Sequence, residues 1–272
     1  MNRICVIIPM YGQAEYTKTC VDLTIQNAGV PCDILVVDDG SPEPYVDSRV
    51  TVLRLDDNRG FTGAINAGIL WAQERNYDYV HLLNNDTEPR AGFIAYLLEE
   101  MAEDVAVASS VRLHPNPVML YSTPIPAQGI TCEYEVELYG IDLIRGYQAV
   151  IRLAQLKNEV IECNWVPTCS SLIPMRVIRE LGLFDKHMRT HSSDLDYCLR
   201  AKIAGYRILI VTDSRVVHFH EVTTKANGIS PENDQRYLLE KLSGLHYAQF
   251  MAKIPLDAEQ KTYGRIQFEV YK

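Results

Sequence analysis

Short apolar runs alternate with amphipathic segments over the first 110 residues. Five runs are almost wholly apolar and rich in β-branched residues, as strands covered on both faces must be; they span 4–8, 34–37, 50–53, 79–83 and 105–108. Apolar residues recur at helical spacing in two of the intervening segments, 61–72 and 90–103. Strands alternating with helices over short links predict an open, mainly parallel α/β sheet.

The second half of the chain has a less regular pattern. Four prolines between residues 115 and 126 prevent a long helix or strand there. Gly205 is a residue at which a helix readily ends. The pattern predicts, in chain order, a loop over 113–130, helices around 143–157, 175–181 and 194–204, a buried strand over 208–211 and a helix over 232–251.

Charge and cysteine content narrow the classes of function. The 35 acidic residues exceed the 26 basic ones, for a formal net charge of −9, so binding to nucleic acid or through a broad basic membrane patch is not expected. Seven cysteines without a CxxC pair indicate neither a disulfide framework nor a zinc site. No apolar run is long enough to span a bilayer. We expect a cytoplasmic protein.

Polar residues follow four of the predicted strands, and the carboxyl ends of strands are where open α/β sheets bind ligands. These polar segments are Pro9–Gly12, Asp38–Ser41, Asn58–Phe61 and Asn84–Asp86. Each could be an ordinary turn, but four at one sheet edge favour a site. The chain has neither a P-loop nor a GxGxxG motif after the first strand. A bound diphosphate would then need a cation, and Asp86 is well placed to hold one.

Three of these segments belong to longer motifs, and further motifs follow in a fixed order. The motifs are VVDDGS at 36–41, NRGFTGAIN at 58–66, LLNNDTEP at 82–89, GLFD at 182–185, DLDYCLR at 194–200, AGYR at 204–207 and VVH at 216–218. Together they resemble the family-2 inverting glycosyltransferases of the GT-A fold, in particular the rhamnosyltransferase-like branch. The resemblance covers about residues 3–220. It implies a nucleotide-diphospho-sugar transferase fold, a mainly parallel open sheet flanked by helices.

The resemblance implies a role for each matched donor residue. Asp39, Pro9 and Tyr11 would contact the nucleotide base, and Asp38 would support their loop. The other donor-binding positions are Asn58, Gly63, Asn85 and Asp86. Asn85-Asp86 stands where the family keeps its DxD-like motif, so Asp86 would bind Mg²⁺ or Mn²⁺ with Asn85 near the ribose. His218 would lie near the metal and diphosphate, and His220 could substitute for it.

The general base implied by the resemblance is Asp194, which would take the proton of the acceptor hydroxyl. Acceptor contacts are expected at Trp165 and Asp196. Each has a plainer alternative: Asp194 could only stabilise the start of its helix, Asp196 could pair with Arg200 at i, i+4, and Trp165 could be a core residue. His218 could likewise be a surface residue.

Two positions depart from the family pattern. Ser193 stands where relatives carry a Glu before the base. Thr168-Cys169 replaces a usual Gly-Ala in a loop that flanks the acceptor site, so acceptor choice is expected to be unusual.

Two rival functions follow from these observations. A sugar-phosphate nucleotidyltransferase shares the beginning of the fold but needs a basic Gly-rich loop after the first strand, and residues 9–15 hold no Lys or Arg. A non-catalytic binding homologue, for sugar nucleotide or glycan, is supported only by Ser193.

The sequence predicts a catalytic domain over 1–220, with a variable insert at 113–160, and a helical extension over 221–272 packed on it or on a second subunit. Expected partners are a UDP- or dTDP-linked sugar and a glycan or lipid-linked acceptor. Nucleic acid is not expected. Membrane association is at most peripheral, and a homo-oligomer is possible.

Overall fold

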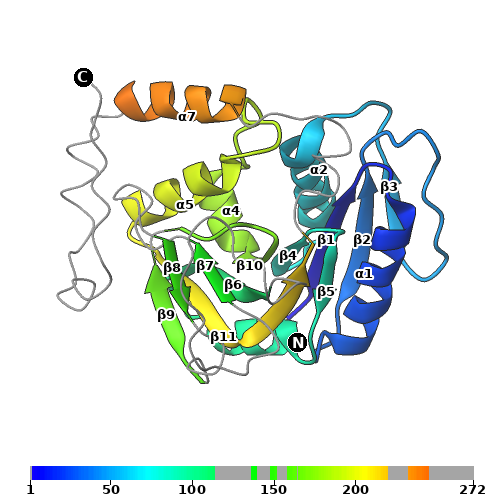
Figure 1. Cartoon of the computed structure of the whole chain (residues 1–272), viewed down its shortest axis with the longest axis horizontal. Helices are drawn as coiled ribbons and strands as arrows, with labels where there is room; N and C mark the ends of the chain where they lie inside the picture. Colours follow the sequence, from blue (N-terminus) through cyan, green and yellow to red (C-terminus); the bar gives the residue numbers. More distant parts are fainter. Residues whose placement is uncertain are drawn as a thin grey trace, which may run out of the picture.

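The structure is a computed structural model, and it describes residues 2–113, 136–139, 148–151, 158–163, 165–219 and 232–244 (Figure 1). The strands are β1 (Ile4–Met10), β2 (Asp33–Asp38), β3 (Thr51–Arg54), β4 (Tyr79–Leu83), β5 (Thr87–Pro89), β6 (Val105–Leu113), β7 (Val136–Tyr139), β8 (Gln148–Ile151), β9 (Val160–Cys163), β10 (Ser170–Pro174) and β11 (Arg207–His218). The helices are α1 (Ala14–Asn27), α2 (Gly60–Glu74), α3 (Phe93–Glu99), α4 (Met175–Leu181), α5 (Ser193–Ile203) and α7 (Glu232–Gly244).

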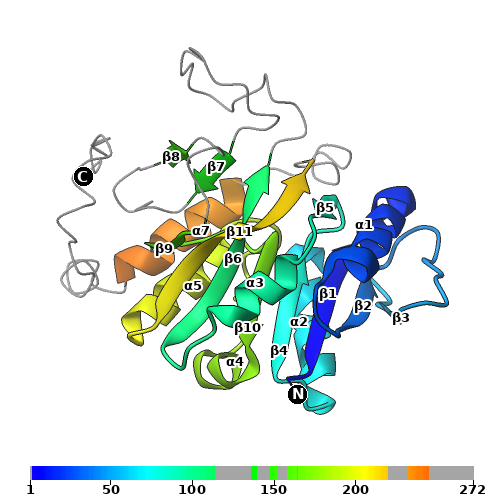
Figure 2. The same ribbon diagram turned by 90° about the horizontal axis from the view of Figure 1, so that it is seen from below.

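One mixed sheet forms the centre of the molecule (Figure 2). Its main path runs β3-β2-β1-β4-β10-β6-β11-β5. The strands from β3 to β4 are parallel to one another, whereas β10 is antiparallel to both β4 and β6. The expected α/β fold is present, and its parallel character is confined to the first half and to the β6–β11 pair.

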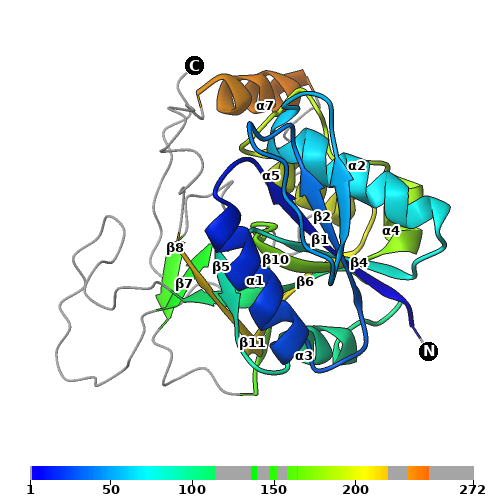
Figure 3. The same cartoon turned by 90° about the vertical axis from the view of Figure 1, so that its right-hand side faces the viewer.

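Helices cover both faces of the sheet, and each face has its own apolar core. Residues of α2, α4 and α5 pack with one face, where Ile65, Ile178 and Tyr197 are fully or nearly fully buried. Residues of α1 and α3 pack on the other face, which buries Cys20 and Leu97 (Figure 3). Strands covered on both faces explain the other apolar runs in the sequence, but the run at 50–53 forms the edge strand β3, which is partly exposed.

Most expected elements are present, and one is wrong. The six expected strands correspond to β1, β2, β3, β4, β6 and β11. The helix expected around 143–157 is contradicted by β8, because Gln148–Ile151 pairs with β7 as an antiparallel hairpin beside β6. The run Ala149-Val150-Ile151 is compatible with a strand as well as with a helix, and its pairing with β7 makes it a strand. Residues 114–130 of the expected loop lie outside the described residues.

Strand β11 connects the sheet to the site. It is twelve residues long, and its register against β6 shifts between Val211 and Arg215. Beyond the shift it pairs antiparallel with β5, so that His218 lies opposite Thr87. This pairing brings the end of β11 beside the Asn84–Asp86 loop.

Helix α7 lies over the loop that leads into α5 (Figure 1). Asp234, Tyr237, Leu238 and Lys241 share one face at i, i+3, i+4 and i+7 spacing, and this face contacts the loop. Asp234 belongs to this docked face, and it is only 8% exposed. Leu245, Phe250 and the rest of the expected helix lie outside the described residues. In the part of the chain that the structure describes, no helix is long and apolar enough to cross a membrane.

Candidate active site

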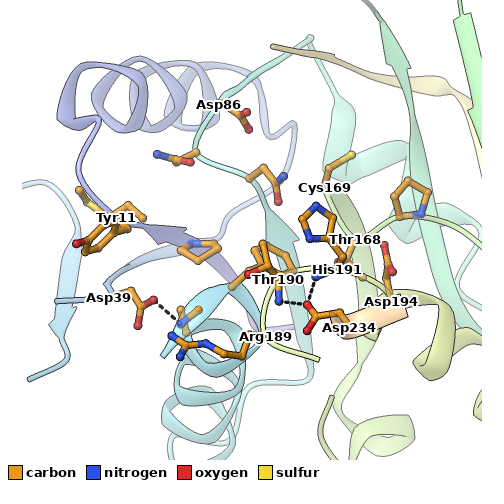
Figure 4. A pocket seen from close by; sticks show the side chains of 18 of the residues that line it. Tyr11, Asp39, Asp86, Thr168, Cys169, Arg189, Thr190, His191, Asp194 and Asp234 are labelled. Atoms are coloured by element: carbon orange, nitrogen blue, oxygen red, sulfur yellow. Dashed lines mark hydrogen bonds between the residues drawn. The ribbon is translucent and has the colours of Figure 1, made fainter. Parts of the chain in front are cut away.

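A cleft of about 920 Å³ opens at the carboxyl ends of β1, β2 and β4 (Figure 4). Eight predicted site residues line it: Pro9, Tyr11, Asp39, Asn58, Asn85, Asp86, Asp194 and His218. The three predicted carboxylates lie apart around it, with Asp39, Asp86 and Asp194 on separate walls (Figure 4). Four predicted residues do not line it: Asp38, Gly63, Trp165 and Asp196.

Asp38 is fully buried beneath the loop that follows β2. Its carboxylate accepts hydrogen bonds from the backbone N–H groups of Ser41 and Tyr45, at 2.9 and 3.1 Å, and pairs with Arg54. Burial by itself would raise the pKa of Asp38, but these hydrogen bonds outweigh it and the pKa is lowered. This geometry agrees with the supporting role that we expect for Asp38.

Asp39 points into the cleft and also connects the loop after β2 to the start of α2 by hydrogen bonds. Its carboxylate oxygens accept the backbone N–H groups of Arg59 and Gly60, at 2.8 and 2.9 Å. Burial raises the pKa of Asp39 to about 6, although both hydrogen bonds act to lower it. Each carboxylate oxygen keeps further acceptor capacity for a donor group of a nucleotide base.

The start of α2 explains why glycine occurs twice in its motif. Gly60 has φ +78°, and a Cβ there would lie 2.7 Å from the carbonyl oxygen of Arg189. At Gly63 a Cβ would collide with the Arg59 side chain. Gly63 therefore acts through helix packing in this structure and does not reach the cleft, whereas Asn58 does.

The Asn84–Asp86 loop and His218 form the candidate metal corner. The Asp86 carboxylate lies 3.2 Å from Nε2 of His218, and both side chains are 8% exposed. The amide nitrogen of Asn84 lies 3.3 Å from the same Nε2, and its Oδ1 is buried without a partner among the described residues. No group of three His, Cys, Asp or Glu side chains that could hold a metal occurs in the described ranges.

These residues fit a divalent cation bound together with a diphosphate. A carboxylate, an imidazole and an orphaned amide oxygen are suitable ligands, and phosphate oxygens and water can complete the shell of Mg²⁺ or Mn²⁺. Asn85 has a different position, because its amide donates to Thr17 Oγ1 of α1 at 3.1 Å. His220 lies outside the described residues.

Asp194 lies on the wall of the cleft across from Asp86 (Figure 4). It lies in the first turn of α5, and its Oδ1 accepts the N–H of Leu195 at 2.8 Å. Burial raises the pKa of Asp194, and the opposing influences include the Arg112 charge and an interaction with the Trp165 side chain. Trp165 thus contacts the acid rather than the open cleft. A carboxylate with a raised pKa is a stronger base than an ordinary one.

Asp196 does not reach the cleft, and the structure gives the expected acceptor role no geometric support. Its side chain is 4% exposed and pairs with Arg200 at 2.9 Å and with Lys241 at 2.6 Å. Asp185 shares Lys241, at 2.8 Å. Both acids therefore belong to an ion-pair network between α5 and α7, which is the plainer alternative for Asp196.

Ser193, the departure from the family pattern, is buried and bonded. Its Oγ accepts a hydrogen bond from Thr62 Oγ1 at 2.9 Å, which links the start of α5 to α2. Ser193 therefore places a neutral, buried hydroxyl where the family pattern has a Glu.

Several cleft residues were not assigned from the sequence. They are Asn84, Arg112, His187, Arg189, Thr190, His191, Asn233 and Asp234. Asn84 begins the NND triplet and could have been found from it. The loop 186–192 has no motif of its own, and the two α7 residues join the cleft only through tertiary packing. Thr168 and Cys169, expected to flank the acceptor site, do line the cleft.

Comparison with known proteins supports the resemblance to family-2 glycosyltransferases. The model of "Glycosyl transferase family 2" matches residues 5–125. Undecaprenyl-phosphate mannosyltransferase of Micrococcus luteus is 31% identical over 130 residues, which are 44% of this chain and 53% of that protein. The chain thus spans about half the length of this curated relative.

Two solved structures share the fold. GalNAc-T7 with UDP, GalNAc and Mn²⁺ superposes with a TM-score of 0.60 at 16% identity, covering 81% of this chain and 44% of that one. The mannosyltransferase PcManGT of Pyrobaculum calidifontis, in complex with GDP-Man and Mn²⁺, gives 0.53 at 15% identity, with 79% and 56% covered. The GT-A fold expected from the sequence is confirmed. The narrower rhamnosyltransferase-like branch stays a prediction. With the family model, the ordered motifs and the fold in agreement, residues 5–125 form a glycosyl transferase family 2 domain.

Proposed function

We propose that this protein is a metal-dependent inverting glycosyltransferase that moves a sugar from a nucleotide-diphosphate donor to an acceptor hydroxyl. The observation that carries the proposal is the single cleft lined by Asp39, by the Asp86–His218 pair and by Asp194. Such a transfer requires three groups: an acid that binds the base, a site for the cation and the diphosphate, and a partly desolvated acid that acts as the general base. Asp39, the Asp86–His218 pair and Asp194 provide them in this order.

The reaction is proposed as one in-line displacement at the anomeric carbon. The acceptor oxygen forms a bond to that carbon while the bond to the diphosphate oxygen breaks, and the electron pair leaves with the nucleoside diphosphate. Asp194 accepts the proton of the acceptor hydroxyl as the new bond forms. Attack from the face opposite the leaving group inverts the anomeric configuration.

Asp86 and His218 would hold the cation, with Asn84 Oδ1 as a further candidate oxygen ligand. When bound, a divalent cation supplies positive charge that offsets the charge developing on the diphosphate. The Mn²⁺ present with both solved relatives supports this choice. Asp39 would orient the base, by accepting the imide N–H of a uracil or thymine.

The donor and acceptor are proposed by class only. A UDP- or dTDP-linked hexose or deoxyhexose suits an acid that accepts an imide proton. The acceptor is proposed to be a glycan or lipid-linked hydroxyl compound in polysaccharide or glycoconjugate synthesis, and the undecaprenyl-phosphate in the name of the Micrococcus relative supports the lipid-linked class. The cysteine content favours a reducing compartment, so we place the reaction in the cytoplasm.

The test is a panel of UDP- and dTDP-sugars incubated with the full chain and Mn²⁺. Thermal shift reports donor binding, and release of nucleoside diphosphate reports turnover. Proton NMR of the product then gives its anomeric configuration. Binding without release of nucleoside diphosphate from any donor would indicate a non-catalytic binding protein, and retention of configuration would contradict the displacement step.

A further inference from the structure

Helix α7 reaches the cleft through Asn233 and through the carboxylate of Asp234. Asp234 is 8% exposed. Its Oδ2 accepts two backbone N–H groups of the loop that precedes α5, from Thr190 at 2.8 Å and from His191 at 2.9 Å (Figure 4). A charged acceptor that satisfies two adjacent amides holds a backbone segment firmly. Thr190, His191 and Asp234 all line the cleft.

The same loop is attached to α2 on its other side. The Arg189 guanidinium donates to the backbone oxygen and the side-chain oxygen of Asn58, at 2.9 and 3.1 Å. The carbonyl oxygen of Arg189 accepts the N–H of Thr62 at 2.9 Å. The segment 189–193 is therefore held between α2 and α7, and it leads directly into Asp194.

Further contacts fix α7 itself. Lys241 bridges Asp185 and Asp196, while the Tyr237 ring stacks on His187 with centroids 5.2 Å apart. These contacts lie on the same helical face as Asp234, so α7 has little freedom to move away from the loop. The loop also carries a buried His191 Nδ1 with no hydrogen-bond partner in the described part of the chain. A ligand bound in the cleft can form a hydrogen bond with this nitrogen.

We propose that Asp234 is a positioning residue that holds the Thr190–His191 backbone, and with it the approach to Asp194 and the His191 imidazole, in the geometry needed for transfer. The proposal rests on the proposed function of Asp194 as general base. It makes α7 a structural part of the catalytic cleft, because a helix far along the chain sets the position of the loop before the base. Asp234 itself takes no proton and binds no donor phosphate.

The direct test is hydrogen–deuterium exchange of the full chain, which needs no substrate. Asp234→Ala should speed exchange of peptides containing the Thr190 and His191 amides about tenfold or more, because each amide loses its acceptor. Asp234→Asn keeps a side-chain oxygen for the same two bonds and should retain most of the protection. Gln235→Ala, an exposed change on the same helix, is the matched control and should leave exchange at the loop unchanged.

Turnover of the donor identified by the panel gives the second readout. Asp234→Ala should lower kcat about tenfold or more while donor affinity stays within about twofold, and Asp234→Asn should restore most of the rate. If Asp234→Asn is as inactive as Asp194→Asn while exchange stays normal, Asp234 acts in the chemistry and the positioning role is wrong. If Asp234→Ala leaves exchange unchanged, the contact itself is refuted. A wild-type chain that turns over no donor would refute the proposed function, and exchange would still test the contact.

Discussion

Nε2 of His218 lies 3.2 Å from the Asp86 carboxylate, although the two residues come from distant parts of the chain. The contact exists because the end of β11 pairs with β5, which begins one residue after Asp86. Two ligand-type side chains thus meet where the diphosphate of a donor is expected. This relationship underlies the first prediction.

Asp86→Ala should abolish metal-dependent donor binding and lower turnover at least about a hundredfold, because the leaving group loses the charge that stabilises it. Isothermal titration with UDP and Mn²⁺, with and without chelator, measures the binding. Circular dichroism should show an unchanged fold. Wild-type activity of Asp86→Ala in chelator would contradict the metal role.

Asp194→Asn should lower kcat by roughly a hundredfold to ten-thousandfold, the usual contribution of a general base, with donor affinity nearly unchanged. The amide keeps the size of the side chain but cannot accept the proton. Steady-state kinetics with the donor from the panel measures the effect. Glu99→Gln, at an exposed carboxylate of α3, is the control and should behave as wild type.

The variant Asp196→Asn tests whether Asp196, rather than its neighbour Asp194, is the general base. Since Asp196 pairs with Arg200 and Lys241 outside the cleft, its loss should lower the free energy of unfolding by about 2 kcal/mol and leave the folded enzyme active. Urea denaturation and kinetics at low temperature measure both. A stable, inactive Asp196→Asn beside an active Asp194→Asn would show that the wrong carboxylate was chosen as base.

Donor binding should weaken below about pH 6, the pKa to which burial raises Asp39. The ionised carboxylate accepts the imide N–H of the base, and protonation removes that acceptor. UDP should therefore bind about tenfold more weakly at pH 5 than at pH 7.5. The control is UDP methylated at N3, which has no N–H to donate, so the ratio of the two affinities isolates Asp39. A ratio independent of pH would refute the contact.

His81 should make the fold less stable in acid. It is fully buried on β4, where Nε2 lies 3.2 Å from Ser170 Oγ, and burial lowers its pKa to about 3. The unfolded chain takes up a proton near pH 6.5 and the folded chain does not, so this contribution is complete above pH 6.5 and is lost as pH falls. Between pH 7.5 and 5 it should cost about 2 kcal/mol of unfolding free energy.

The measurement is urea denaturation of the wild type and of His81→Gln across that pH range. The variant should be less stable at neutral pH, and its stability should fall by about 2 kcal/mol less on acidification. Parallel curves for the two proteins would show that His81 is not the titrating group.

The sequence alone predicted six of the strands, most of the longer helices and the wall of the cleft that carries Asp39 and Asp86. Strands buried on both faces must be apolar along their whole length, so β1, β2, β4 and β6 could be recognised from composition. The loops that follow parallel strands meet at one edge, which is why Asp39 and Asp86 could be assigned together. The motif order then led to the family, now supported by the family model over residues 5–125.

Tertiary structure alone decided what reaches the cleft from elsewhere. A sequence pattern records which face of a helix is apolar, but not which polar groups that face will meet. The contact of Asp234 with the Thr190 and His191 amides therefore follows only from packing. Asp196, which was expected to contact the acceptor, pairs with Lys241 instead. Strand pairing likewise converted an expected helix into β8. Pairing and ion-pair partners depend on residues far apart in the chain, and periodicity within one segment carries no record of them.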